Sequence, residues 1–492
     1  MKILLVSSNC YSQFPGVFPN GVGALSAYLK QKGHDVHSIH YYKKSDIRGI
    51  GARLREVNPD VVGISILSCE LPIVEPTAAA VKQWKPEIPV IVGGIHAIVD
   101  PENTVRLKNI DAVCAGEGEL AFTEYLERLE KGEDVVSTPN FAFLIDGKMV
   151  LNDHLQFIKD LNSLPRFDRT VADLQRIIDA NNGVINLLFG RGCPWHCKFC
   201  GNEYIRRRGS GTYSRMVDVQ TAMQELAQLE KNYDFEEICI RDDTFSWNRK
   251  WAAEFLEEYS RRFRYPIHVF SRPDTLDDDM IAGLAKAGCV NIFIGLDSGN
   301  DYIRNEVLNK KQSNDELFRV TGLIRDAGMI PVISNIVGLP FETPEMFQET
   351  VEVNKRLHED KVVFSAAFGA TPKIWVFTPW PGTDLYNLSV EKGWLKTFKD
   401  PVKVYRESML EMPQFPQREI ERRFRTFRYH VYKDRFPMMA ALFLVFDSKW
   451  FQAVYERIPM ETMGKLRKNI LNIYRLFGRK GKKARMDLPA SN

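Results

Sequence analysis

The feature that most constrains the fold is an alternation of short apolar runs with helical patterns, which occurs twice in the 492 residues. Before about residue 130, segments with helical spacing such as Ala24–Lys32 and Thr77–Trp84 separate the apolar runs. Parallel strands need helical connections of this kind, so the pattern predicts a βα series with a parallel sheet. The five predicted strands are Lys2–Val6, Val36–Ile39, Val61–Ile66, Val90–Val92 and Ala112–Cys114.

A second series runs from Val184 to about Thr383, again with helical stretches between the strands. Its first five predicted strands are Val184–Phe189, Glu237–Arg241, Ile267–Phe270, Val290–Gly295 and Ile330–Val337. The sixth strand is either Val362–Phe368 or Ile374–Phe377. Repeated βα units suit a barrel, in which binding sites lie at the carboxyl ends of the strands.

Three of the eight cysteines lie in one loop directly after the first strand of this second series. Cys193, Cys197 and Cys200 have the spacing CxxxCxxC, and soft thiolates select iron-sulfur clusters, zinc or copper(I). A structural zinc site needs four protein ligands; no partner CxxC or HxxxH follows, although His196 could be a fourth ligand. A four-iron cluster usually takes four cysteines, so three thiols would leave one iron open to a small molecule.

Composition limits the other classes of function. The formal net charge of +3 gives no global reason to expect a nucleic-acid partner, and 44% hydrophobic with 26% charged residues is typical of a globular protein. The clustered cysteines favour a reduced compartment with a metal site over a disulfide framework. The N-terminus has no signal-peptide pattern, and no apolar run reaches the ~20 residues that span a bilayer, so we expect a cytoplasmic protein.

The cysteine loop, with Phe199 just before its last cysteine, resembles the signature of the radical S-adenosylmethionine (SAM) superfamily. The resemblance implies a 4Fe–4S cluster on the three cysteines, with SAM bound at the open iron and cleaved to a 5′-deoxyadenosyl radical. Thr378–Thr383 matches a Pro-x-Pro-Gly-Thr element common in the cobalamin-linked part of that superfamily. The SAM-binding residues that the resemblance implies at the strand ends are Asp242, Asp243, Thr244, Arg272, Asp297, Ser298 and Gly338.

Some of these strand ends also have an ordinary structural interpretation. Asp242, Asp243 and Thr244 can cap the N-terminus of the following helix. Arg272 can pair with a surface acid as well as with the methionine carboxylate of SAM. The sequence leaves both interpretations open.

Glycine-rich stretches at the ends of the first series of strands resemble the cobalamin-binding domain that precedes one large group of radical SAM enzymes. Other such domains carry Asp-x-His-x-x-Gly, whose histidine ligates cobalt from below, and the loop from Ser8 to Gly16 lacks it. We therefore expect cobalamin without a histidine lower ligand. Cys69 and Glu70 would lie near that lower face by resemblance, but a surface turn is the favoured interpretation of both. The implied cofactor-binding residues are Gly21, Ser65, Gly93, Gly94, Gly116, Glu117, Gly118 and Glu119.

The expected fold class is α/β, with four parts along the chain. These are a Rossmann-like cobalamin-binding domain at 1–135, a hairpin and linker at 136–182, a partial (βα)6 TIM-like barrel at 183–385, and a helical C-terminal region at 386–492. The apolar run Phe436–Phe446 is interpreted as a helix packed on the barrel, with a cover over a lipid-like or tetrapyrrole substrate as the alternative. Nine basic residues and no acid between Lys465 and Arg485 favour a solvated tail, with peripheral contact to an anionic membrane as the alternative.

The resemblance implies a cobalamin-dependent radical SAM methyltransferase that acts on an unactivated carbon of a small-molecule substrate, with apolar metabolites as the first class to search. Its electron would come from a donor such as flavodoxin or ferredoxin. A non-methylating radical SAM enzyme with the same domain order (a cyclase, an oxidase or a rearrangement enzyme) is the alternative. A corrinoid or iron-sulfur sensor or carrier is an alternative of another class, against which the complete set of strand-end motifs argues.

Overall fold

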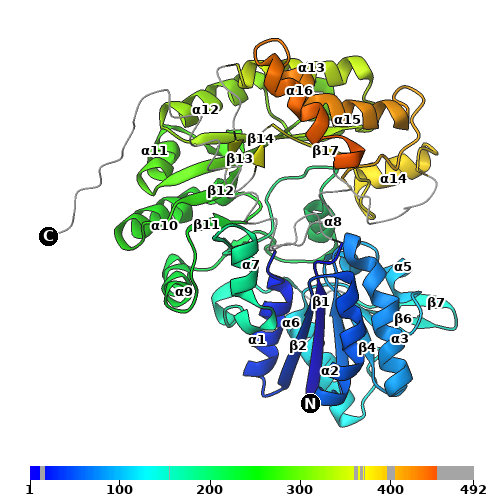
Figure 1. Ribbon diagram of the computed structural model, residues 1–492. Helices are drawn as coiled ribbons and strands as arrows, with labels where there is room; N and C mark the ends of the chain where they lie inside the picture. The colour runs from blue at the N-terminus through cyan, green and yellow to red at the C-terminus, as the bar shows by residue number, and fades with distance from the viewer. Residues whose placement is uncertain are drawn as a thin grey trace.

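The computed structural model describes residues 1–11, 17–153, 156–359, 364–365, 369–370, 372–395 and 405–451. Two large sheets organise these residues, one in the N-terminal domain and one in the domain that follows. In Figure 1 the N-terminal domain lies below the second domain, and helix α8 (Gly201–Arg208) lies between them. Both alternating series of the sequence therefore fold as predicted, each around its own sheet.

The first sheet has seven strands in the order β2-β1-β3-β4-β5-β6-β7. The predicted hairpin supplies its two antiparallel strands, β6 (Phe141–Ile145) and β7 (Lys148–Leu151). The hairpin turn at Asp146 and Gly147 has φ values of 48° and 74°, the left-handed geometry that a two-residue turn requires. The five parallel strands occupy the predicted places: β1 (Lys2–Ser8), β2 (Asp35–Tyr41), β3 (Val61–Ser65), β4 (Val90–Gly93) and β5 (Ala112–Cys114).

Helices cover both faces of the first sheet, so its strands are apolar on both sides. In β1, Ile3 and Leu5 join the core on one face, and Leu4 and Val6 join the core on the other. The helices of this domain are α1 (Asn20–Gln31), α2 (Ile50–Val57), α3 (Val74–Trp84), α4 (Ile95–Val99), α5 (Pro101–Val105) and α6 (Gly118–Lys131).

The second sheet has six parallel strands in the order β17-β14-β13-β12-β11-β8 and forms an open half-barrel. Its sixth strand is β17 (Lys373–Val376), which agrees with the candidate Ile374–Phe377. The other candidate, Val362–Phe368, falls mostly outside the described residues. The remaining strands are β8 (Val184–Leu187), β11 (Glu237–Ile240), β12 (Ile267–Ser271), β13 (Cys289–Asp297) and β14 (Ile330–Val337).

Five helices alternate with the strands of the half-barrel. Polar side chains cap the N-termini of four of them, and Ser313 and Thr343 each accept a hydrogen bond from the backbone three residues on. The helices are α9 (Val219–Asn232), α10 (Arg249–Arg262), α11 (Asp278–Lys286), α12 (Asn314–Asp326) and α13 (Pro344–Leu357).

A continuous apolar core joins the first sheet, the linker and the half-barrel. Leu174 of linker helix α7 (Leu174–Ala180) belongs to the same cluster as Ile3 of the first sheet and Ile185 of the second. Asp168 of the linker also accepts a hydrogen bond of 2.6 Å from Ser26 in α1. The two domains are therefore fixed to each other through the linker.

Three C-terminal helices pack beside β14 and β17 in a second core: α14 (Asp384–Glu391), α15 (Gln417–Tyr432) and α16 (Pro437–Phe446). The predicted helix at Phe436–Phe446 is α16, and it buries Ala440 and Phe443. The basic segment from Lys465 to Arg485 lies outside the described residues. Among the helices that the structure describes, none is long and apolar enough to cross a membrane.

Candidate functional site

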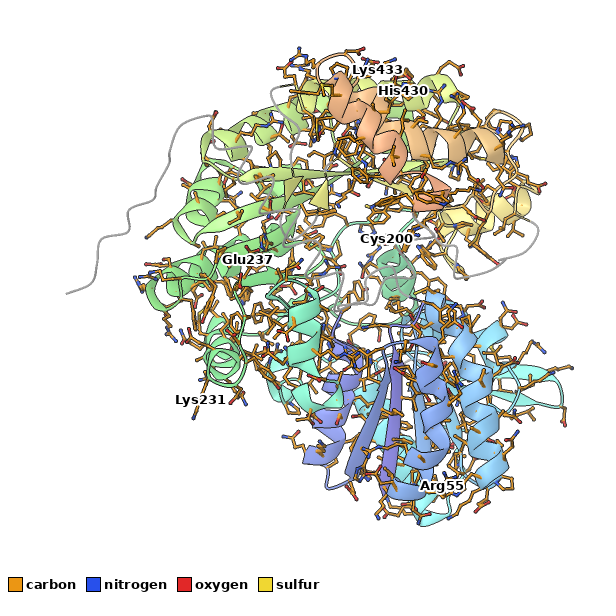
Figure 2. The ribbon with its side chains drawn as sticks, in the orientation of Figure 1. Arg55, Cys200, Lys231, Glu237, His430 and Lys433 are labelled. Atoms are coloured by element: carbon orange, nitrogen blue, oxygen red, sulfur yellow. The ribbon has the colours of Figure 1, made fainter. Side chains whose placement is uncertain are left out.

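The cysteine loop is closed at its base by a short antiparallel pair, β9 (Gly190–Arg191) with β10 (Arg215–Met216). Gly192 then turns the chain with a φ of 84°, where a Cβ atom would lie only 2.5 Å from the carbonyl oxygen of Tyr213. The loop ends where α8 begins, directly after Cys200. Figure 2 shows Cys200 in the middle of the molecule, between the two domains.

All three loop cysteines are free thiols, and each has a polar neighbour. The Sγ atom of Cys193 lies 3.9 Å from Thr244 Oγ1, that of Cys197 lies 4.0 Å from Arg272 Nη1, and that of Cys200 lies 3.7 Å from Asn202 Nδ2. Burial raises the pKa of all three thiols, that of Cys200 to about 12. Free thiols of this kind would deprotonate on binding a metal.

The donor set fits an iron-sulfur cluster. The loop supplies three soft sulfur atoms, and N–H groups of Arg272 and Asn202 point at two of them. Hydrogen bonds of this kind adjust the reduction potentials of iron-sulfur clusters. Among the described residues, no three His, Cys, Asp or Glu side chains come close enough to share a single metal ion. The cysteines of a four-iron cluster each bind a different iron, so they need not meet at one point.

The two acids after β11 have different surroundings. Asp242 is 3% exposed and accepts backbone hydrogen bonds from Phe189 (2.9 Å) and Gly190 (2.8 Å), so it holds the chain just before the cysteine loop. Burial raises the pKa of Asp242 to about 6. Burial also raises the pKa of Asp243, which accepts a hydrogen bond from the Asn202 side chain beside Cys200. Asp243 is therefore the acid of the pair that lies beside the cysteines.

Arg272, at the end of β12, braces the cysteine loop. It donates to both carboxylate oxygens of Asp274 (2.9 and 3.0 Å) and to the backbone oxygen of Lys310 (2.8 Å). Its guanidinium also lies over the Trp195 ring, 4.5 Å from the centroid. The acid that pairs with Arg272 is thus only two residues away in the sequence. The Arg272 guanidinium also contacts Cys197.

Sequence reasoning missed Lys310, a 5% exposed lysine whose side chain reaches the carboxyl end of β13. Its ammonium donates to Asp297 Oδ2 and to the backbone oxygen of Gly295, both at 2.5 Å. The charges of Lys310 and Arg272 oppose the burial that raises the pKa of Cys197. A lone lysine between two loops carries no motif, so no local pattern could have identified it.

The other predicted residues of the barrel lie nearby but make structural contacts. Ser298 is fully buried, and its backbone oxygen accepts a hydrogen bond from Arg304 at 2.8 Å. Gly338 has a φ of 82°, and its N–H donates to buried Glu342, whose pKa burial raises to about 8. Phe199 packs against the core of the C-terminal helices.

In the first domain, all the predicted cofactor-binding residues line one cavity of about 320 Å³ at the carboxyl ends of the strands. Apolar side chains such as Leu25, Ile91 and Phe122 form most of the remaining wall. A Cβ atom added at Gly21 would meet no protein atom within 4 Å. The predicted residues on the cavity wall are Gly21, Ser65, Gly93, Gly94, Gly116, Glu117, Gly118 and Glu119.

This edge of the first sheet fits a large, largely apolar cofactor. Ile95, at the start of α4, lines the cavity and is 39% exposed, so an apolar side chain there is free to contact a bound group. Glu70 is fully buried and accepts hydrogen bonds from Ser8 Oγ (2.5 Å) and the Tyr11 backbone (2.9 Å). The interpretation of Glu70 as a surface turn is therefore wrong, because the carboxylate ties the loop after β1 to the loop after β3.

Two glutamates on the cavity wall bind arginines of the barrel domain, and we call this set of four residues the domain bridge. Arg215 donates to both carboxylate oxygens of Glu117 (2.7 and 3.2 Å), and Arg191 contacts Glu117 at 3.3 Å. Arg191 also pairs with Glu119. Burial raises the pKa of Glu117, but the hydrogen bond from Arg215 and the charge of Arg191 lower it below its usual value.

The domain bridge places the two candidate sites next to each other. Arg191 lines the 320 Å³ cavity and stands two residues before Cys193. Sequence reasoning assigned Glu117 and Glu119 to cofactor binding and did not identify their arginine partners, which are more than 70 residues away along the chain.

Comparison with known proteins agrees with this architecture. The B12 binding domain family matches residues 16–126, and the Radical SAM superfamily matches residues 187–353. An uncharacterized methyltransferase of Pyrococcus horikoshii is 28% identical over 422 residues, which cover 82% of this chain and 87% of that protein. An anaerobic magnesium-protoporphyrin IX monomethyl ester cyclase of Rubrivivax gelatinosus is 25% identical over 402 residues, covering 79% and 70% of the two chains.

Among solved structures, the cobalamin-dependent SAM radical enzyme OxsB, with aqua-cobalamin and SAM bound, has a similar fold. The TM-score is 0.70 at 15% identity, and the match covers 99% of this chain and 82% of that one. The chain therefore carries an N-terminal B12-binding domain followed by a radical SAM domain. Its cofactors are accordingly a 4Fe–4S cluster, SAM and cobalamin, and such an enzyme needs a reductant.

Proposed function

We propose that this protein is a cobalamin-dependent radical SAM methyltransferase that acts on an unactivated carbon of a small molecule. The observation that carries the proposal is the position of Arg191, which lines the cavity of the B12-binding domain two residues before the first cysteine. When bound, the cluster with SAM would supply a hydrogen-abstracting radical and cobalamin would supply the methyl group. The chain itself would hold these groups beside one substrate and keep water away.

The polar residues at the ends of the barrel strands suit SAM. Cys193, Cys197 and Cys200 would hold the cluster, and Asp243 with Thr244 would face the methionine amino group. Asp242 accepts hydrogen bonds from two backbone N–H groups, so we assign it to positioning the chain before the cysteine loop. Lys310 and Arg272 would balance the negative charge of the thiolates and of the methionine carboxylate.

Tyr405 marks where the substrate would lie. Burial raises the pKa of its phenol, and the charges of Cys69 in the first domain and Cys200 in the loop raise it further. Trp375 and Trp380 pack edge-on against it at 5.7 and 5.6 Å. Within the described part of the chain, no side chain hydrogen-bonds the Tyr405 hydroxyl. This hydroxyl would bind a polar atom of a substrate that is otherwise held by aromatic rings.

A non-methylating radical reaction is the second candidate, and the similarity to a cyclase favours it. One experiment separates the two. The reconstituted protein is incubated without oxygen with cobalamin, SAM and a reductant such as reduced flavodoxin or ferredoxin, and 5′-deoxyadenosine and S-adenosylhomocysteine are counted by mass spectrometry. Both products, the second only with cobalamin, would support methyl transfer; 5′-deoxyadenosine alone would support the second candidate. If neither product forms in protein whose iron content has been confirmed, both candidate functions are excluded.

A further inference from the structure

Helix α16 has an unusual distribution of apolar side chains. Its sequence, Pro-Met-Met-Ala-Ala-Leu-Phe-Leu-Val-Phe, contains no polar residue, yet Ala440 and Phe443 are its buried positions. A helix that is apolar on all sides is normally buried, in a core or in a lipid phase. Six of the fifteen large hydrophobic side chains that are exposed in the described part of the chain lie between residues 438 and 450.

Three of the exposed side chains lie on one face of this helix. Met438, Leu442 and Val445 follow the spacing i, i+4, i+7 and are 85%, 45% and 51% exposed. Trp450, four residues after the end of α16, is 72% exposed. We call these four residues the outer face of α16.

The opposite side of α16 is anchored to the protein. Ala440 and Phe443 enter the core formed with α15, and the Arg428 guanidinium of α15 lies 5.0 Å from the centroid of the Phe443 ring. Asp447 pairs with the same arginine at the end of the helix. The outer face is therefore held in a fixed orientation by α15.

Exposed cations flank the outer face at both ends. Arg435 stands two residues before α16, pairs with Glu359 at 3.4 Å and keeps its side chain 59% exposed. Lys449 follows the helix, pairs with Glu421 at 3.2 Å and is 64% exposed. The sequence from Lys465 to Arg485 adds nine basic residues and no acid. An apolar face between cations is complementary to an anionic bilayer surface, where apolar side chains enter the headgroup boundary and cations bind lipid phosphates.

We propose that the outer face of α16 docks the protein on an anionic membrane surface. Ten residues of helix extend about 15 Å, half of what a bilayer core needs, so the helix would lie in the plane of the interface. Trp450 would lie at headgroup level, the usual position of an interfacial tryptophan. Docking of this kind does not depend on methyl transfer, since no residue of the candidate active site takes part.

Vesicle flotation of the full-length, cofactor-reconstituted protein tests the proposal. Wild-type protein should float with phosphatidylglycerol-containing vesicles much more than with pure phosphatidylcholine vesicles, and salt should weaken the binding. The double variant Leu442→Glu/Val445→Glu should bind at least tenfold more weakly. The matched control is Val390→Glu, which charges an isolated valine of α14 with 48% exposure and should leave flotation unchanged.

Three results would overturn the proposal. The first is an absence of wild-type flotation with anionic vesicles. The second is equal flotation of wild type and the double variant. If removal of residues 465–492 then abolishes binding, the membrane contact belongs to the tail and not to α16. The third is a wild-type dimer, seen by light scattering, that becomes monomeric in the double variant while vesicle binding is absent, which would assign the face to a second copy. Circular dichroism of each variant verifies that it is folded.

Discussion

The carboxyl ends of the two sheets differ in chemistry although both follow the same βα pattern. The edge of the first sheet forms a cavity of glycines and apolar side chains, and its two glutamates are committed to arginines of the other domain. The edge of the second sheet gathers thiols, buried acids and the cations Arg272 and Lys310. The first edge suits a large cofactor that is recognised by shape and close backbone approach, and the second edge suits a small charged one that is recognised by placed charges. Two sheets built on one pattern can therefore present opposite kinds of binding site.

We expect the largest effect from a substitution in the cysteine loop, at the carboxyl edge of the second sheet. Replacing one loop thiol, Cys197→Ala, should remove the cluster, because three thiolates are the minimum set available in the loop. Wild-type protein should contain about four irons per chain after reconstitution, and the variant should contain few or none and form no 5′-deoxyadenosine. The matched control is Cys239→Ala, a buried strand cysteine outside the loop, which should retain its iron. Full iron content in Cys197→Ala would contradict the assignment.

The next effect breaks the first edge by filling its cavity. Gly21 lines the cavity, and a Cβ atom there would meet no protein atom within 4 Å, so Gly21→Phe adds a large side chain at the cavity wall without a clash at its first atom. The variant should weaken cobalamin binding about a hundredfold by exclusion and leave the iron content unchanged. Binding is measured from the absorbance of cobalamin retained after gel filtration and by titration. Gly322→Phe is the control, since it is also a helical glycine with free space around it but lies in α12, away from the cavity. Equal cobalamin binding by both variants would place the cofactor elsewhere.

A smaller effect tests the connection between the two edges. Glu119→Gln removes the charge that faces Arg191, and we expect a loss of about 2 kcal/mol in the free energy of unfolding, since one partner of a partly buried pair is left uncompensated. The double variant Glu119→Gln/Arg191→Met should lose less than the sum of the single variants, which a double-mutant cycle in denaturant measures. Strict additivity would show that the two side chains do not interact in solution.

We expect the smallest effect from a conservative substitution of Arg272 at the carboxyl edge of the second sheet. Arg272→Lys keeps the charge but loses the two-pronged contact with Asp274 and the stacking on Trp195. We expect about a tenfold slower formation of 5′-deoxyadenosine, and a changed electron paramagnetic resonance signal of the reduced cluster, at unchanged iron content. Arg356→Lys is the control, because that arginine stacks on Phe318 far from the loop. An unchanged rate and signal would show that Arg272 does not position the loop.

Much of the fold could be predicted from the sequence because it rests on local periodicity. The strands at Ala112–Cys114 and Ile267–Phe270 follow from hydrophobic runs alone. The cysteine loop could be found because its three candidate ligands lie within eight residues of the sequence. The residues of the glycine-lined cavity could be found because each follows a strand of one parallel sheet.

Contacts between distant segments could not be predicted in this way. Glu117 was assigned to a cofactor, and only the folded chain shows that it binds Arg191 and Arg215. An acid at a strand end looks the same in sequence whether its partner is a ligand or an arginine of another domain. Likewise the apolar pattern of α16 indicated a helix but not which side of it would remain uncovered, since that depends on how α15 packs against it.

The domain bridge has a consequence for the electron that must enter the cluster site. Glu117 and Glu119 balance two arginines on the strands at the base of the cysteine loop. If the barrel were produced without the first domain, those two positive charges would remain beside the loop without their counter-charges. Nearby positive charge makes a cluster easier to reduce, so the isolated barrel would have a higher reduction potential than the whole protein. The first domain would thus contribute to the reduction potential of a cluster held by the second domain.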